Sequence, residues 1–172
     1  MSPHEIFSSI SRHQASEIFG YIQEKKKPFY KTAIENLAKQ RRLRPVFVER
    51  KPRNERFLWM QTSLGRKANE DIAAHLLQIW LVGAHSDLLC NFLDALGIHH
   101  DDDGTVEVLP DAPSKDELKE AVDGLLENHD PGVVAIYLNA FQAMDEEGGW
   151  RTLEELLAED ERLKLTHVAD LV

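Results

Sequence analysis

The chain of 172 residues contains a single cysteine, Cys90, so no disulfide bond can form within it. The neighbours of this cysteine are apolar, in the run Leu88-Leu89-Cys90, and its thiol is therefore expected to act as a small buried hydrophobe. A chain of this length can bury a core without disulfide bonds. A reducing compartment, by default the cytoplasm, is the expected location.

Long hydrophobic runs are also missing. The longest uninterrupted apolar stretch lies near Ile79–Val82, whereas a membrane-spanning helix needs about 20 apolar residues. The first twenty residues include Glu5, Arg12 and Glu17, in a region that an export signal would keep apolar. We therefore expect neither an export signal nor a membrane partner.

The motifs of common cofactor and metal sites are missing as well. The sequence has no phosphate-binding loop, no dinucleotide fingerprint, no His-Glu-x-x-His motif and no Cys/His cluster. The nearest approach to a metal site is the acidic turn His99-His100-Asp101-Asp102-Asp103-Gly104. In the register of a calcium-binding EF-hand loop, His99 and Pro110 occupy the first and last ligand positions, which need carboxylates. The prediction is a solvated acidic turn, with no metal and no cofactor.

One tripeptide, His85-Ser86-Asp87, contains the residue types of a hydrolytic triad. Adjacent side chains diverge, so these three residues cannot form a proton relay among themselves. Ser86 is better explained as the N-cap of a helix. Enzymatic activity is therefore not the favoured function class.

Signals for helices dominate the sequence and predict an all-α fold. Capping boxes are predicted at Ser2–Glu5, Ser114–Glu117 and Thr152–Glu155, and Asp130-Pro131 begins another helix. Gly97 and Gly148-Gly149 are predicted to end helices. The predicted architecture is one domain over residues 1–172, an irregular bundle of six or seven helices in antiparallel pairs.

Apolar spacing places the helices of the first half of the chain. One helix is expected from Ser2 to about Glu24, and a second is expected from Pro28 to Arg44, where the following proline disfavours helix. Residues 45–54 are expected to form an extended arm, because Val46-Phe47-Val48 favours β-structure and Pro52 blocks a continuous helix.

Further along, Asn54 is expected to cap a helix that ends at Leu64. The helix after Asn69 is apolar nearly all round, so it is expected to be central, with Trp80 buried in the core.

An internal similarity occurs at an offset of 45 residues. The segment Phe92-Leu93-Asp94-Ala95-Leu96 aligns with Tyr137-Leu138-Asn139-Ala140-Phe141, each in the second helix of a pair. The period is in the range of helical-pair repeats such as HEAT, although antiparallel helix pairs share apolar spacing without being repeats. A HEAT-like arrangement is therefore one interpretation of the bundle.

Charge is distributed very unevenly. Residues 25–67 hold 14 of the 20 Lys and Arg residues and have a net charge of +11, whereas residues 68–172 have a net charge of −19. The chain is therefore divided into a basic helix-and-arm segment and an acidic helical core. An asymmetry of this size concerns partners and assembly and says little about the fold.

The basic segment contains the candidate binding residues. Its basic residues come in clusters, with Phe29, Tyr30, Phe47, Phe57 and Trp59 between them. The favoured function is a non-catalytic cytoplasmic interaction or scaffold protein, whose basic surface binds a protein partner or a second copy of the chain. The alternative is a nucleic-acid-binding accessory protein that uses the same residues on phosphates. The candidate binding residues are Arg41, Arg42, Arg44, Arg50, Lys51, Arg53 and Arg56.

Overall fold

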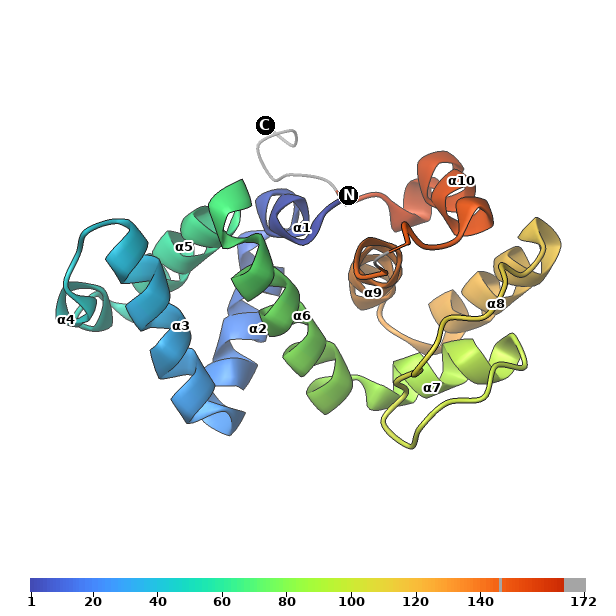
Figure 1. Cartoon of the computed structure of the whole chain (residues 1–172), viewed down its shortest axis with the longest axis horizontal. Helices are drawn as coiled ribbons and strands as arrows, with labels where there is room; N and C mark the ends of the chain where they lie inside the picture. Colours follow the sequence, from blue (N-terminus) through green and yellow to red (C-terminus); the bar gives the residue numbers. More distant parts are fainter. Residues whose placement is uncertain (146, 166–172) are drawn as a thin grey trace. The chain divides into compact units, whose positions relative to one another are not determined.

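A computed structural model describes residues 1–145 and 147–165 of the chain. Over these residues the protein is all-helical, with ten α-helices, two short 3₁₀ helices and no β-strand (Figure 1). The predicted all-α fold is thus confirmed. The helices divide into two compact units, an N-terminal unit with Ser2–Trp80 and a C-terminal unit with Leu81–Leu165. The prediction of one domain over residues 1–172 stays a prediction.

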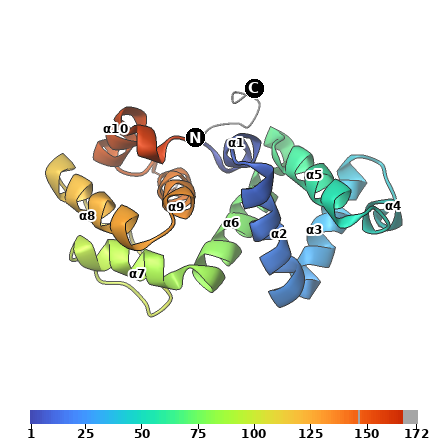
Figure 2. The ribbon, with the colours of Figure 1, turned by 180° about the vertical axis from the view of Figure 1, so that it is seen from behind.

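The N-terminal unit is built around its aromatic side chains. The ring of Phe19 stacks on Phe7 at 5.8 Å and meets Phe57 edge-on at 5.5 Å. These contacts hold α1 and α2 against α5, and α3 packs against both α2 and α5 (Figure 2). The elements are α1 Pro3–Ser9, α2 Arg12–Lys25, α3 Lys27–Gln40, α4 Pro45–Glu49, α5 Arg53–Leu64, η1 Lys67–Asn69 and α6 Glu70–Ala84, which continues past the end of the unit.

The prediction of one continuous helix from Ser2 to Glu24 is wrong. Helix α1 ends at Ser9, and a second capping box starts α2, in which the hydroxyl of Ser11 accepts a hydrogen bond from the backbone N–H of Gln14 at 3.1 Å. The side chain of Gln14 accepts the reciprocal bond from the backbone of Ser11 at 3.0 Å. Apolar spacing continues across this break, because both helices bury a face in the same core.

The prediction of an extended arm over residues 45–54 is also wrong. Residues Pro45–Glu49 form the short helix α4, with the proline at its first position, where its fixed φ suits a helix. Val48 is completely buried, and burial of an apolar side chain outweighs the small β-preference of this run. The next helix then begins at Arg53 with Pro52 as its N-cap, two residues before the predicted cap Asn54.

Several predicted helix ends are confirmed. The capping boxes Ser2–Glu5 and Ser114–Glu117 are present, and the side chain of Asp130 caps α9. Two predicted caps are wrong by one residue or more. His85, instead of Ser86, is the N-cap of α7, and Trp150 precedes α10, while the hydroxyl of Thr152 donates to the carbonyl of Pro113 at 3.0 Å.

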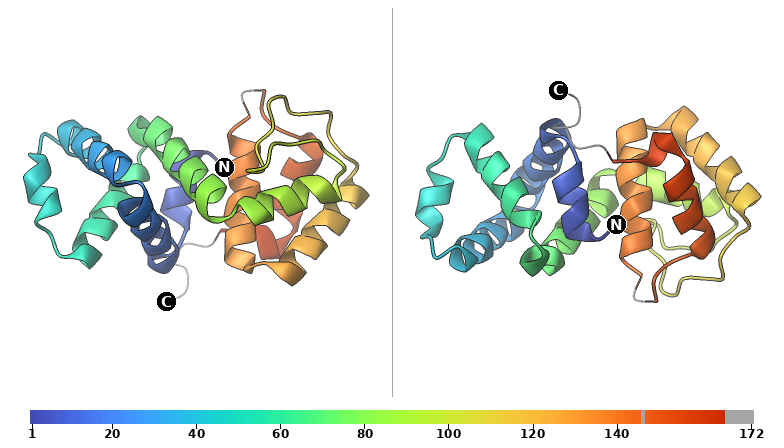
Figure 3. Two further views of the ribbon diagram at one scale, coloured as in Figure 1. Left: turned by 90° about the horizontal axis from the view of Figure 1, so that it is seen from below. Right: turned by 90° about the horizontal axis from the view of Figure 1, so that it is seen from above.

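In the C-terminal unit, α9 is the central helix, because seven consecutive residues from Val134 to Ala140 are all buried. Helix α7 packs on α8, and α10 packs on α8 and α9 (Figure 3). The rings of Phe92, Tyr137, Phe141 and Trp150 form a continuous aromatic cluster in its core. The elements are α7 Ser86–Ala95, α8 Lys115–Asn128, α9 Pro131–Ala143, α10 Arg151–Glu159 and η2 Glu161–Leu163.

The helix that was expected to be central, α6, has an exposed side. It buries Leu76, Leu77 and Trp80, the last with 3% of its surface exposed, as predicted. It exposes Asp71 and Gln78. Other apolar residues of α6 are half-buried. The helix therefore has one buried and one exposed face, although its sequence is apolar nearly all round.

A long loop between α7 and α8 carries the acidic turn and folds back on α7. Gly104, the last residue of this turn, is buried, and a β-carbon added to it would collide with Leu89. The thiol of Cys90 is half-buried and donates a hydrogen bond to the carbonyl of Asp102 at 3.4 Å. Desolvation and the neighbouring carboxylates raise the pKa of this thiol, so it is not an activated nucleophile.

Candidate interaction surface

The candidate site is one end of the N-terminal unit, where α4 joins α3 to α5 (Figure 1). We call this surface the basic–apolar patch, since it combines exposed basic side chains with exposed apolar ones. Residues 41–56 contain seven basic and two acidic residues. The patch consists of Arg41, Arg42, Leu43, Arg44, Val46, Phe47, Arg50, Lys51 and Arg53.

The turn after α3 sets the beginning of the patch. The backbone N–H of Leu43 donates to the carbonyl of Ala38 at 2.9 Å, and that of Arg42 donates to Lys39 at 3.0 Å. This pair of bonds is the Schellman motif, which satisfies the last carbonyl groups of a helix. The residue at the turning point, Arg42, has a φ of 55°. The left-handed turn redirects the chain, and Pro45 then starts α4.

Helix α4 is held by a single apolar anchor. The side chain of Val48 is completely buried, whereas Phe47 is 58% exposed and Val46 37% exposed. Leu43, just before the helix, is 39% exposed. The other large exposed hydrophobics among the described residues are Met1, Leu58 and Val108. Half of these side chains are therefore in the patch, and a cluster of this kind is typical of an interaction surface more than of a solvated loop.

Arg56 stabilises the turn that carries part of the patch. Its Nε donates to the hydroxyl of Tyr30 at 2.8 Å, and its Nη1 lies 3.3 Å from the carbonyl of Glu49 and 3.2 Å from that of Lys51. These bonds fix the turn between α4 and α5. Burial raises the pKa of Tyr30, and the nearby Arg56 guanidinium partly opposes that rise. Of the seven predicted binding residues, Arg56 is thus the one whose donors are used within the protein.

The remaining predicted residues are at the surface. Lys51 is half-buried, and the guanidinium of Arg53 lies over the ring of Phe57 at 5.0 Å. Cation–π contact leaves the guanidinium N–H groups available to an anion. The other four residues, Arg41, Arg42, Arg44 and Arg50, are exposed.

The basic side chains of the patch form no ion pair with any carboxylate in the described parts of the chain. The C-terminal unit differs in this respect. There Lys115 pairs with Glu159 at 2.6 Å, and Arg162 pairs with both Asp123 and Asp160. Ion pairs also join Arg151 to Glu155 and Lys164 to Glu161. The positive charge of the patch is therefore not neutralised by side chains of the described residues.

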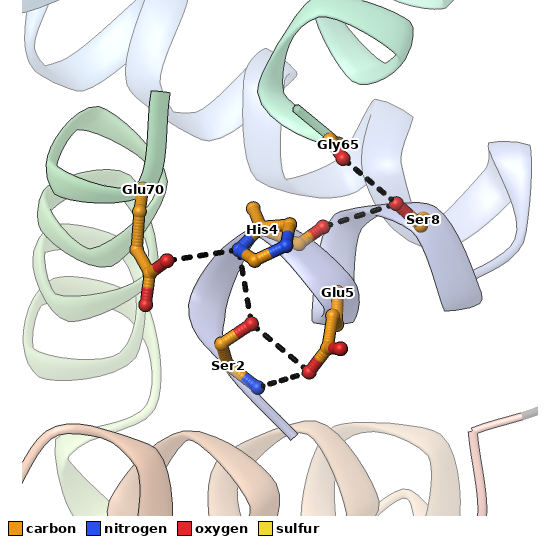
Figure 4. A network of polar contacts seen from close by, with 6 residues as sticks. All are labelled: Ser2, His4, Glu5, Ser8, Gly65 and Glu70. Atoms are coloured by element: carbon orange, nitrogen blue, oxygen red, sulfur yellow. Dashed lines mark hydrogen bonds and ion pairs between the residues drawn. The ribbon is translucent and has the colours of Figure 1, made fainter. Parts of the chain in front are cut away.

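A second polar cluster, near the start of the chain, does not have the geometry of a catalytic relay (Figure 4). His4 Nδ1 lies 2.9 Å from the hydroxyl of Ser2 and 3.0 Å from the carboxylate of Glu70. A relay needs the nucleophile and the orienting carboxylate on opposite ring nitrogens, whereas both groups share one nitrogen here. The hydroxyl of Ser2 also contacts Glu5 at 2.9 Å. The cluster ties the first turn of α1 to α6.

The acidic turn His99–Gly104 is folded by its own side chains. Thr105 donates to the carboxylate of Asp103 through both its backbone N–H, at 3.0 Å, and its hydroxyl, at 2.6 Å. These bonds lower the pKa of Asp103. Over residues 1–145 and 147–165, no group of three or more His, Cys, Asp or Glu side chains is arranged to hold a metal ion.

His100 lies between two acceptors. Its Nε2 is 2.7 Å from the carboxylate of Asp94, and its Nδ1 is 2.6 Å from the carbonyl of Asp101. Both ring nitrogens must carry a proton to make both bonds. The hydrogen bond to the carbonyl of Asp101 is the larger cause that raises the pKa of His100, and the bond to the carboxylate of Asp94 is the second.

The contribution of His100 to the stability of the fold should therefore be lost as the pH rises above about 6.5, the ordinary histidine value. A histidine whose pKa is higher in the folded than in the unfolded protein stabilises the fold fully at a pH below its unfolded pKa. This stabilisation disappears as the pH rises through its folded pKa. Melting temperatures measured between pH 5 and 9 should show the loss in the wild type and a flatter profile for His100→Gln. The exposed neighbour His99 provides the control, since His99→Gln should keep the wild-type slope. Identical profiles for all three proteins would contradict the assignment.

No single helix in the described ranges is long and apolar enough to cross a membrane. One bent pair, Lys67–Ala84 with Ser86–Ala95, passes the same test by length and composition. Both helices contribute buried side chains to cores, among them Leu76, Leu77 and Phe92.

Two features of the site were missed by sequence reasoning. The hydrogen bonds of Arg56 reach Tyr30, which is 26 residues away, and nothing in the sequence connects the two. The left-handed conformation of Arg42 was missed because that position of a helix end usually carries glycine or asparagine. A signal was nevertheless present, since Pro45 predicts a helix end just before it, and a left-handed residue is common at helix ends.

Comparison with protein-family models, with curated proteins and with solved structures found no match to this chain, so its own residues carry the functional argument.

Proposed function

We propose that this chain is a non-catalytic interaction protein of the cytoplasm, which self-associates when its basic–apolar patch binds the acidic surface of a second copy. The observation that carries the proposal is the patch itself, where arginines that form no ion pair with the described residues flank the exposed Leu43, Val46 and Phe47 along the chain. Apolar area supplies binding energy, and the surrounding charge supplies specificity and a high association rate.

Charge complementarity supports a second copy as the occupant. Residues 68–172 carry a net charge of −19, and among the described ones only a few carboxylates pair with Lys or Arg. Every molecule therefore presents an acidic surface to the patch of its neighbour. A single exposed ion pair contributes only about 0–1 kcal/mol, so the contact depends on several arginines together with the apolar side chains.

Self-association should respond to salt. We expect light scattering to show a dimer or larger species at low ionic strength, and a shift towards monomer as the Debye length falls to about 8 Å at physiological ionic strength and further beyond it. A chain that is monomeric at every ionic strength would refute the proposal.

Charge reversal tests whether the patch makes the contact between copies. The variant with Arg50, Lys51 and Arg53 all changed to Glu should be monomeric under conditions in which the wild type associates. The matched control changes Lys25, Lys26 and Lys27 to Glu, because these three exposed residues give the same change of charge outside the patch. The control should still associate. Equal effects of the two variants would show that the overall charge, and not the patch, drives association.

Nucleic acid is the alternative partner, and the exposed ring of Phe47 is the observation that favours it. An aromatic ring among arginines can stack on an unpaired base while the guanidinium groups bind phosphates. Binding of a single-stranded oligonucleotide would then weaken with salt, by about 0.7 in the log–log slope for each phosphate neutralised. Retention of the oligonucleotide by a monomeric wild type would favour this alternative.

We also propose that the helix pairs of the acidic half are related by an internal repeat of HEAT-like type. The support is the contact between two positions that are equivalent at the 45-residue offset, since the rings of Phe92 and Tyr137 meet edge-on at 5.6 Å. Each of these residues lies in the second helix of its pair, α7 or α9. The predicted basic arm is not extended, since it contains helix α4. We keep only the proposal that this basic segment is a binding surface.

A further inference from the structure

Arg42 has an unusual backbone conformation for its residue type. Its φ of 55° lies in the left-handed region, and it is the only residue other than glycine with positive φ in the described parts of the chain. For a residue with a β-carbon this conformation is unfavourable, because the β-carbon lies too close to the following carbonyl oxygen. Glycine or asparagine usually occupies this position at the end of a helix.

The fold requires a left-handed residue at this position, but it does not require an arginine. The bonds that close the turn, from Arg42 to Lys39 and from Leu43 to Ala38, use backbone atoms alone. The side chain of Arg42 is exposed and makes no hydrogen bond or ion pair with the described residues. No side-chain contact of Arg42 with the described residues offsets the unfavourable backbone conformation, and strain of this kind is concentrated at functional sites.

We infer that Arg42 is an anchor of the basic–apolar patch, and that its guanidinium binds a carboxylate on the acidic surface of the partner copy. This inference rests on the proposed function. A guanidinium group presents a planar fork of donors that matches a carboxylate in two parallel hydrogen bonds. Arg42 is flanked in the sequence by the exposed Arg41 and Leu43, and Arg44 follows. A partner carboxylate would thus meet guanidinium groups beside apolar surface that excludes water.

The test separates fold stability from binding at one position. Arg42→Gly should raise the melting temperature by about 2–4 °C, measured at high salt where the chain is monomeric. The same variant should weaken self-association at low salt by about tenfold or more, measured by sedimentation equilibrium. A variant that is both more stable and weaker in binding shows that the arginine is kept for the contact.

Matched variants control for charge and for backbone. Arg41→Gly removes the same charge one residue earlier, where φ is −88°, so it should not raise the melting temperature. It should also weaken association less than Arg42→Gly does. Arg42→Lys keeps the charge and the strain but loses the fork, so its association should fall between wild type and Arg42→Gly.

The outcomes distinguish the anchor role of Arg42 from the proposed self-association through the patch. If the wild type associates and Arg42→Gly associates equally well, the anchor role is refuted while the patch remains. An unchanged or lowered melting temperature in Arg42→Gly would refute the claim that the arginine strains the fold. A wild type that never associates refutes the proposed function itself.

Discussion

Replacement of Trp80 by alanine is expected to leave the protein insoluble or without fixed tertiary packing. The side chain is 3% exposed in α6, in a row with the completely buried Leu76 and Leu77. Truncation of a buried tryptophan costs about 3–5 kcal/mol, from lost transfer energy and the cavity left behind. Since domains are stable by about 5–15 kcal/mol, this loss is a large part of the total.

Thermal unfolding followed by near-ultraviolet circular dichroism measures the effect. The control is Trp59→Ala, which removes the same side chain from a half-buried position on α5 and should cost much less. A Trp80→Ala protein that melts at the wild-type temperature would show that this face of α6 is not part of the core.

Substitution of Gly104 by alanine is the second change expected to have a large effect. Its φ is 81°, and an added β-carbon would lie 2.4 Å from the β-carbon of Leu89 and 3.1 Å from the backbone nitrogen of Cys90. Neither neighbour can move freely, because both belong to α7. Backbone strain and overpacking together should cost about 2–5 kcal/mol. Denaturant unfolding should show a lower midpoint at unchanged slope.

Gly97 provides the matched control for that substitution. It also has a positive φ, of 68°, but an added β-carbon would find no atom within 4 Å. Gly97→Ala should therefore cost only the strain, about 1 kcal/mol after the gain from a stiffer unfolded chain. Equal losses for the two variants would mean that the acidic turn is not packed against α7 as described.

The C-terminal unit was more predictable from sequence than the N-terminal one, for reasons visible in particular residues. The capping box Ser114–Glu117 and the Asp130-Pro131 start combine a cap with an apolar face, so two local signals agree at each helix start. At Ser11 the apolar spacing continues through the cap, and the break was missed. At Val46-Phe47-Val48 the intrinsic preference and the final structure disagree, since burial of Val48 decides the conformation.

The candidate site shows the same division between local and distant information. The exposed arginines of the patch were identified from their clustering in sequence, because charge is carried by composition. The supporting role of Arg56 was not identifiable, since it depends on where Tyr30 and two backbone carbonyls lie in space. A binding residue and a structural residue of the same type cannot be distinguished until their partners are known.

The sequence alone thus determined that the chain is all-α, where most helices start, and that a basic segment is followed by an acidic one. These properties follow from short-range causes, namely capping side chains, apolar spacing and the count of charges. Only the tertiary structure decided that residues 45–49 are helical, that α9 is the central helix of its unit, that Phe47 is exposed, and that the arginines of the patch form no ion pair with the described residues. Those properties depend on which surfaces are buried against one another, and burial is settled by contacts between residues far apart in the chain.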